Sequence, residues 1–116
     1  MVRHRERSTW EIPGGHREPM EDLEKGAARE LYEESGAEVF DLIPIAVYSV
    51  TDGDRKTYGQ LFYSKVESMG QLPAFEIAEV RFVDALPDNL TYPAIQPVLA
   101  QRIDEFHKQI VQNDIA

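Results

Sequence analysis

The sequence predicts an α/β fold, an α/β/α sandwich in which helices cover both faces of a mixed sheet, on the basis of three observations. A short β-like segment ends at the turn residues Pro13-Gly14-Gly15, and a helical pattern follows it. Segments rich in β-branched residues fill the middle of the chain, and an amphipathic helical pattern comes last. This order within 116 residues, without an internal repeat or an evident linker, indicates one domain over residues 1–116.

The first part of the chain is expected to hold the end of a strand and a helix. Residues 10–12 are typical of a strand that stops at the Pro-Gly-Gly turn. Over residues 20–35, apolar side chains recur at helical spacing, and Gly36 follows as a helix C-cap. The apolar face of this helix carries Leu23, Ala27 and Leu31.

The second part is expected to be a hairpin, a short strand and a helix. Residues 39–50 and 57–66 are predicted strands, and Asp52-Gly53-Asp54 between them is typical of a hairpin turn. A further strand is expected at 80–83. Pro93 is predicted to begin an amphipathic helix, because proline suits the first turn. Its apolar stripe comprises Ile95, Val98, Leu99, Ile103, Phe106 and Ile110.

Composition excludes several classes of function. The chain has no cysteine, which excludes a disulfide framework, a thiolate zinc site and a cysteine nucleophile. Its formal net charge of −9 repels a phosphate backbone, so a polymeric nucleic acid is not the expected partner. No apolar run is long enough to span a membrane, and the first residues do not resemble a signal peptide. The expected location is the cytoplasm.

Acidic residues are concentrated in one segment, with eight carboxylates between Glu18 and Glu38. Like charge at this density costs free energy unless water or a cation screens it. Glu30, Glu33 and Glu34 stand at i, i+3 and i+4 of the predicted helix, so their carboxylates converge on one face. Such an oxygen-rich group suits Mg²⁺ or Mn²⁺, although glutamate-rich helix faces are more often plain solvated surface.

The full spacing resembles the Nudix box, G-x5-E-x7-R-E-U-x-E-E-x-G-U, where U is apolar. Ala37 is smaller than the usual residue at the last apolar position, which concerns packing rather than chemistry. The other fixed positions match and are Gly15, Glu21, Arg29, Glu30, Leu31, Glu33, Glu34 and Gly36. The resemblance implies a Nudix-type sandwich, and this one is expected to be shortened at the N-terminus because the chain enters its first strand almost at once.

The resemblance also implies an activity, since Nudix hydrolases cleave nucleoside diphosphates linked to a group X and use a divalent metal, usually Mg²⁺. Carried over by position, Glu33 and Glu34 would be metal ligands, and Glu30 would be a ligand or a general base. Arg29 would orient these glutamates, and Glu21 would support the loop. Two further ligands are implied, the Gly14 carbonyl and a glutamate of a later loop, for which Glu76 is the expected residue and Glu79 the alternative.

The substrate is less clearly indicated. Residues 18–21 and 92–98 resemble MutT-like nucleoside triphosphate pyrophosphatases, in which an asparagine reads the oxidised purine. Ile95 takes that place here and cannot form the paired hydrogen bond, so strict 8-oxoguanine selectivity is not expected. The candidate substrate-binding residues are Arg3, Arg5, Tyr48, Tyr58 and Ile95, each of which also has an ordinary structural explanation.

Two other interpretations stay open at this point. The domain could be a catalytically idle nucleotide sensor, although three intact glutamates argue against it. It could also be a truncated fragment that needs a partner chain. A missing first strand would leave an open sheet edge, which predicts a homodimer formed through the N-terminal side of the sheet.

Overall fold

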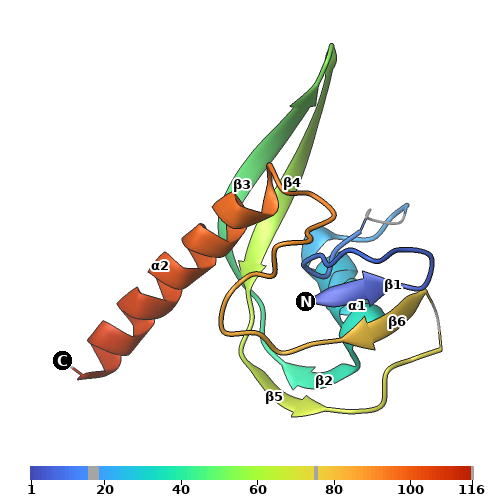
Figure 1. The fold of residues 1–116 in the computed structure, drawn as a ribbon. Coiled ribbons are helices and arrows are strands. Elements are labelled where there is room, and N and C mark those ends of the chain that lie inside the picture. The colour runs from blue at the N-terminus through green and yellow to red at the C-terminus, as the bar shows by residue number, and fades with distance from the viewer. Residues whose placement is uncertain (16–18, 75, 116) are drawn as a thin grey trace.

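The structure, a computed structural model, describes residues 1–15, 19–74 and 76–115 and has the expected α/β composition (Figure 1). Glu18, one of the eight clustered carboxylates, lies outside the described residues. Two helices and six strands are present in this part of the chain. They are β1 (Val2–His4), α1 (Leu23–Ser35), β2 (Ala37–Phe40), β3 (Ile43–Asp52), β4 (Arg55–Tyr63), β5 (Val66–Met69), β6 (Ile77–Val80) and α2 (Gln96–Ile115).

The described strands form three antiparallel pairs, β1 with β6, β2 with β5 and β3 with β4. A parallel contact occurs only as an isolated bridge between Trp10 and Leu90 in this part of the chain. The α/β class is therefore confirmed, while the predicted mixed sheet is divided into separate pairs.

Helix α1 ends where the sequence predicts and begins slightly later. Asp22 is the N-cap, and its side chain accepts a hydrogen bond from the Lys25 N–H at 2.7 Å. Gly36 is the C-cap, with a left-handed φ of 80°, and its N–H donates to the Tyr32 carbonyl. Local capping thus fixes both ends of the helix.

The predicted β3–β4 hairpin is confirmed, with Gly53 at a positive φ of 62° in its turn. The single strand expected over 39–50 is instead two strands, because the chain breaks at Asp41 and Leu42. Ser64 Oγ donates to the Asp41 carbonyl, and the Lys65 N–H donates to the Asp41 side chain. These bonds redirect the chain, so that β2 and β3 pair with different partners.

Three expected elements are displaced. Residues 10–12 form no strand, and Trp10 and Glu11 make only isolated bridges to Leu90 and Val2. The strand expected at 80–83 lies at Ile77–Val80, where it pairs with β1. Helix α2 begins at Gln96 rather than at Pro93, since the Tyr92 carbonyl closes a turn by accepting from the N–H groups of residues 95 and 96.

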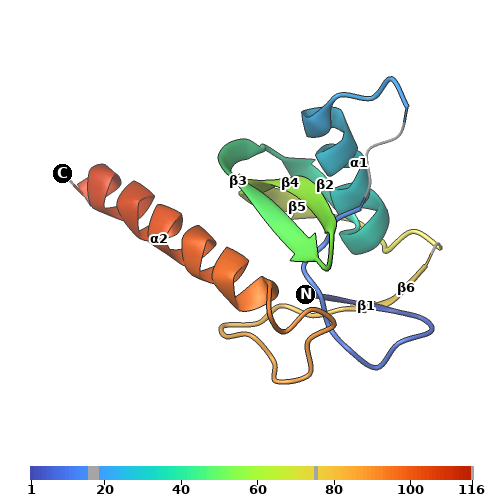
Figure 2. The same cartoon turned by 90° about the horizontal axis from the view of Figure 1, so that it is seen from above.

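The two helices pack very differently. Helix α1 contacts β2 and β6, whereas α2 extends away from the rest of the molecule and contacts β4 (Figure 2). The Tyr63 ring meets Phe106 edge-on at 5.2 Å, and the Tyr63 hydroxyl lies 2.8 Å from His107 Nδ1. Neither helix, in the part of the chain that the structure describes, combines the length and apolar character needed to cross a membrane.

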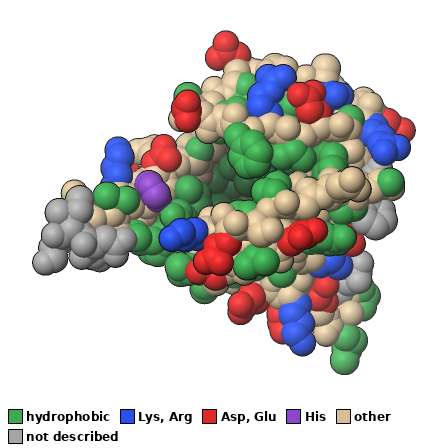
Figure 3. Space-filling model, turned by 90° about the horizontal axis from the view of Figure 1, so that it is seen from below, with side chains coloured by type: hydrophobic (Ala, Val, Ile, Leu, Met, Phe, Trp, Pro, Cys, Tyr) green, Lys and Arg blue, Asp and Glu red, His purple; other side chains and the backbone are tan. Residues whose placement is uncertain are grey.

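The molecule is open. Its accessible surface is 8364 Å², whereas a compact monomer of this mass exposes about 6,500 Å². Figure 3 shows a hollow with apolar side chains on its wall. The described buried apolar residues are Val2, Trp10, Ala37, Leu61 and Ile77.

The open edge expected at the N-terminal strand is closed at Val2. Its backbone pairs with Val80 on one side and exchanges two hydrogen bonds with Glu11 on the other. The predicted interface was based on unpaired backbone N–H and C=O groups at this edge, and at Val2 these groups are paired within the chain. The homodimer stays a prediction.

Substituting Gly36 tests the cap of α1. A Cβ there would lie 2.9 Å from the Gln71 carbonyl oxygen and 3.0 Å from that of Gly70. We therefore expect Gly36→Ala to lower the free energy of unfolding by about 2 kcal/mol or more, from left-handed strain plus backbone crowding. Gly53→Ala is the matched control, because Gly53 has a similar φ and nothing within 4 Å, and should lose only about 1 kcal/mol. Equal losses in urea unfolding would contradict the crowding.

Candidate active site

The carboxylates of α1 meet β6 and its preceding loop around one cavity. This cavity has a volume of about 260 Å³. Glu30, Glu33 and Glu34 line it from the second half of α1, together with Arg29. Glu76 and Ile77 close it from the other side. The structure thus brings the α1 residues singled out in the sequence to one place and adds the expected later glutamate.

Arg29 is the cation at the centre of this carboxylate cluster. Its Nη1 donates to Glu30 at 2.9 Å and to Glu33 at 3.2 Å. Its Nε and Nη2 donate to the two oxygens of Glu21 at 2.9 and 3.0 Å. The guanidinium therefore contacts three carboxylates and fixes Glu30 and Glu33 relative to the loop that carries Glu21.

The Gly14-Gly15 turn approaches the helix closely. The Gly14 N–H donates to Glu34 Oε2 at 2.8 Å. A Cβ on Gly15 would lie 2.6 Å from Glu30 Oε1, so a larger residue would displace the Glu30 carboxylate. The Pro-Gly-Gly sequence thus does more than turn the chain, because it brings backbone against two of the glutamates.

Glu34 is the most buried member of the cluster, with 8% of the residue exposed. Burial raises the pKa of its carboxyl to about 7. The Gly14 hydrogen bond opposes this rise, while the negative charges of Glu30, Glu11 and Glu76 add to it. Glu34 thus ionises close to neutral pH.

The helix itself does not favour this arrangement. Glu33 and Glu34 lie in the last turn of α1, which contains no basic residue. The C-terminal end of a helix carries partial negative charge, so acidic side chains there lose about 0.3–1 kcal/mol each when exposed. These glutamates thus stand at the unfavourable end of α1, where Arg29 contacts Glu33 and the Gly14 N–H donates to Glu34.

The structure distinguishes the two candidate glutamates of the later loop. Glu76 lines the carboxylate cavity, and its backbone carbonyl accepts from the Arg5 N–H. Glu79 instead contacts Arg3 and Arg81 and lines a different cavity. By placement, Glu76 is the member of the carboxylate cluster.

Comparison with known proteins agrees with the box found in the sequence. A family model described as the NUDIX domain matches residues 1–106. The chain belongs to the NUDIX family. It is also 33% identical over 92 residues to a Bacillus subtilis (strain 168) protein named "Putative 8-oxo-dGTP diphosphatase YtkD". That match covers 78% of this chain and 58% of the relative, so the chain spans little more than half the length of that protein.

The donor set of this NUDIX domain fits a hard divalent cation, since carboxylate oxygens are the ligands that Mg²⁺ prefers. Among the described residues, however, no group of three or more His, Asp or Glu side chains is arranged to hold a metal ion. Arg29 forms ion pairs with two of the cavity's carboxylates, Glu30 and Glu33, while Glu34 accepts from the Gly14 N–H.

Glu11 is a site residue that the sequence interpretation missed. It is 6% exposed, and it contacts Arg7 at 3.1 Å and His4 through Nε2. Its charge acts on Glu34, and His4 links it to Glu76 through an Nδ1–Oε2 distance of 3.9 Å. The signal in the sequence was an acidic residue between Trp10 and Ile12, where a buried strand favours apolar residues.

The candidate substrate-binding residues do not join the carboxylate cluster. Arg3 and Arg5 line the other cavity. Tyr48 lies against Gly59 in the hairpin, and Tyr58 is 72% exposed with the Lys56 ammonium over its ring. Ile95 lies half-buried in the turn before α2. None of the five lines the cavity of the glutamates.

The raised pKa of Glu34 predicts how stability depends on pH. A carboxyl with a higher pKa when folded binds its proton more tightly in the folded state. The free energy of unfolding in EDTA should therefore fall as pH rises from about 4.5 to about 7, by up to about 3 kcal/mol from this group. In urea unfolding, the Glu34→Gln variant should lack this pH-dependent part of the free energy of unfolding. The Glu24→Gln variant, which changes an exposed residue of the same helix, should keep it. A wild-type pH dependence in Glu34→Gln would contradict the assignment.

Proposed function

We propose that this domain hydrolyses a phosphoric anhydride bond in nucleoside triphosphates or in nucleoside diphosphates linked to another group. The observation that carries the proposal is the carboxylate cluster around one cavity, which lies within the residues that match the NUDIX family model. The chain is strongly acidic overall, so a polyphosphate needs cations between it and these glutamates. Mg²⁺, or Mn²⁺, is the proposed cofactor.

The residues have distinct proposed roles. Glu33 and Glu34 would hold the metal together with Glu30, and the Gly14 carbonyl and Glu76 would complete the set. A bound divalent ion would polarise phosphoryl oxygens and lower the pKa of a coordinated water. As an alternative to binding the metal, Glu30 would act as the general base toward the attacking water. Arg29, with Glu21 as its second anchor, would orient the glutamates when the cation draws them into the cavity.

The burial of Glu34 suits this exchange. A carboxyl that ionises near neutral pH loses little when it meets a cation, because the cation favours its charged form. Among the described residues, four carboxylates and one arginine line this cavity, and a divalent ion would offset most of their excess negative charge. The ion pairs with Arg29 then hold Glu30 and Glu33 while no metal is bound.

The named relative suggests 8-oxo-dGTP as one substrate to test. Ile95 has no amide with which to read an oxidised purine, and it does not line the carboxylate cavity. We therefore propose a broad preference among nucleoside triphosphates.

A nucleotide sensor is the second candidate. The observation that favours it is the engagement of Glu30 and Glu33 by Arg29, which leaves no ready-made metal group among the described residues. A sensor would bind nucleotide without cleaving it. The third interpretation, a fragment that needs a partner chain, predicts neither binding nor cleavage of nucleotide by this chain alone. It is consistent with the match to a relative of which this chain covers 58%.

Metal dependence tests the hydrolase. Nucleotides incubated with Mg²⁺ should yield a nucleoside monophosphate and a phosphate product, identified by mass, and excess EDTA should abolish this. Glu34→Gln should lower kcat/KM by about a hundredfold or more, because a neutral amide is a poor ligand for Mg²⁺. Glu24→Gln is the matched control and should retain activity. Full turnover in EDTA, or in Glu34→Gln, would refute the proposal, and binding without cleavage would favour the sensor.

Specificity is tested separately with 8-oxo-dGTP and dGTP under the same Mg²⁺ concentration. We expect their kcat/KM values to differ by less than about a thousandfold, since no paired amide contact distinguishes the bases. A larger preference for 8-oxo-dGTP would show that another residue reads the oxidised base. Ile95→Asn provides the complementary measurement and should raise the preference if this position faces the base.

A further inference from the structure

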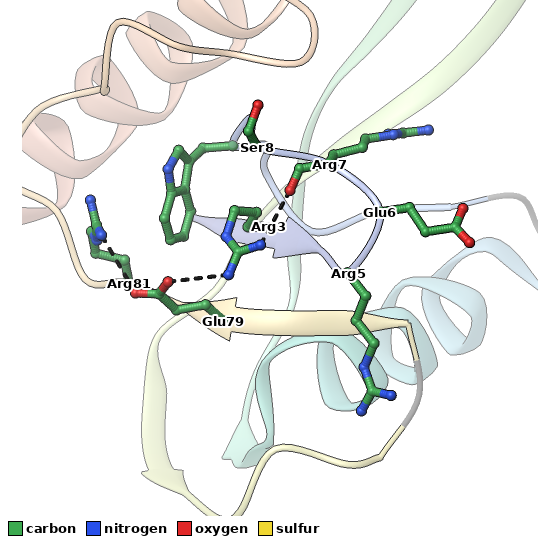
Figure 4. A pocket seen from close by; sticks show the side chains of 8 residues that line it. Arg3, Arg5, Glu6, Arg7, Ser8, Glu79 and Arg81 are labelled. Carbon is green, nitrogen blue, oxygen red and sulfur yellow. Dashed lines mark hydrogen bonds and ion pairs between the residues drawn. The ribbon is translucent and has the colours of Figure 1, made fainter.

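A second cavity lies beside β1 and β6 and is lined mainly by arginines, and none of its described lining residues also lines the carboxylate cavity. Its volume is about 440 Å³. Arg3, Arg5, Arg7 and Arg81 line it, with Trp10 and Glu79 (Figure 4). These are four of the eight arginines of the chain, and no lysine lines the cavity. We call this group the arginine pocket.

The acidic side chains near this pocket do not balance it. Glu79 is shared, since it lies 3.5 Å from Arg3 and 3.4 Å from Arg81. In Figure 4 these two arginines reach Glu79 from different sides. One carboxylate between two guanidiniums leaves one positive charge unbalanced. This local excess is opposite in sign to the net charge of the whole protein, which is −9.

The rim of the pocket adds to this excess. In Figure 4 the Arg5 and Arg7 side chains point in different directions, away from the group formed by Arg3, Glu79 and Arg81. Arg7 is paired with Glu11, but within the described residues the Arg5 side chain has no hydrogen-bond or ion-pair partner. Glu6 also lines the cavity, and its negative charge lowers the excess positive charge of the arginines without cancelling it.

A buried tryptophan and its neighbours form the centre of the pocket. Trp10 is 5% exposed, and its backbone is held by hydrogen bonds with Asn89 and Thr91. The Arg81 guanidinium lies 4.4 Å from the centre of the Trp10 ring. Arg3 is held by a hydrogen bond of its Nη1 to the Arg7 carbonyl at 3.2 Å. Both guanidiniums thus have contacts within the protein that orient them toward the pocket, and such orientation lowers the entropic cost of binding.

We propose that the arginine pocket binds a phosphoryl group. Guanidinium forks match the oxygens of a phosphate, and their surplus charge would be offset by a dianion. The cavity is large enough for inorganic phosphate, for pyrophosphate or for the phosphate end of a nucleotide. This site is separate from the carboxylate cluster, so its occupation requires neither a metal nor hydrolysis.

The single tryptophan of the chain reports on this site directly. In EDTA, which disables any metal site, phosphate and pyrophosphate should change Trp10 fluorescence with a saturable curve, while chloride at equal ionic strength should not. Arg81→Gln and Arg3→Gln should each weaken binding about tenfold or more, measured by calorimetry because Arg81 also affects the fluorescence. Arg55→Gln, at the exposed start of β4, is the matched control and should leave the affinity unchanged.

The absence of a saturable signal, an equal effect of chloride, or wild-type affinity in both pocket variants would overturn the proposal. A competition experiment distinguishes the sources of the phosphoryl group. If dGTP in EDTA displaces pyrophosphate, the pocket accepts nucleotide phosphates, and if it does not, the free ions are the ligands. Because no metal is present, a failure of the proposed hydrolysis would leave this result unaffected.

Discussion

The ion pairs of Arg29 are the interaction on which the arrangement of the site depends. One guanidinium holds Glu21, Glu30 and Glu33, so it connects the loop before α1 to the second half of that helix. The backbone at Gly15 then fits against the Glu30 carboxylate only because Gly15 carries no side chain, and the Gly14 N–H donates to Glu34. Without Arg29, negative charges on the last turns of α1 would repel one another and the end of the helix.

Strand β6 separates this acidic region from the arginine pocket. Glu76 and Ile77, at its start, line the carboxylate cavity, while Glu79 turns to Arg3 and Arg81. On the other strand, His4 contacts Glu11 and Glu76, whereas Arg3 contacts Glu79. The short β1–β6 pair therefore lies between two clusters of opposite charge, which the ion pair of Arg7 with Glu11 connects at one point.

The parts that sequence predicted correctly depend on neighbours along the chain. The backbone has a positive φ at Gly36, where α1 ends, and at Gly53, in the hairpin turn. A glycine at each position is a local signal in the sequence for this conformation. The box from Gly15 to Gly36 likewise lies within one loop and one helix. Elements fixed by distant contacts were misplaced, because the position of β6 depends on β1, and the split of residues 39–50 depends on Ser64 and Lys65. Glu11 was missed because its effect on Glu34 depends on contacts between separate segments, whereas its partner Arg7 lies only four residues away in the sequence.

The open packing of the other half has a limited effect on these sites. The β3–β4 hairpin and α2 contribute no lining residue to either cavity. Helix α2 is anchored mainly at Tyr63, and the buried Gln96 Oε1 at its first turn has no hydrogen-bond partner among the described residues. Such an unpaired buried group costs about 1–3 kcal/mol. The caps of α1, the Arg29 ion pairs and the β1–β6 pairing do not involve α2. Motion of α2 would therefore alter the stability of the domain before it altered the geometry of the carboxylates or the arginines.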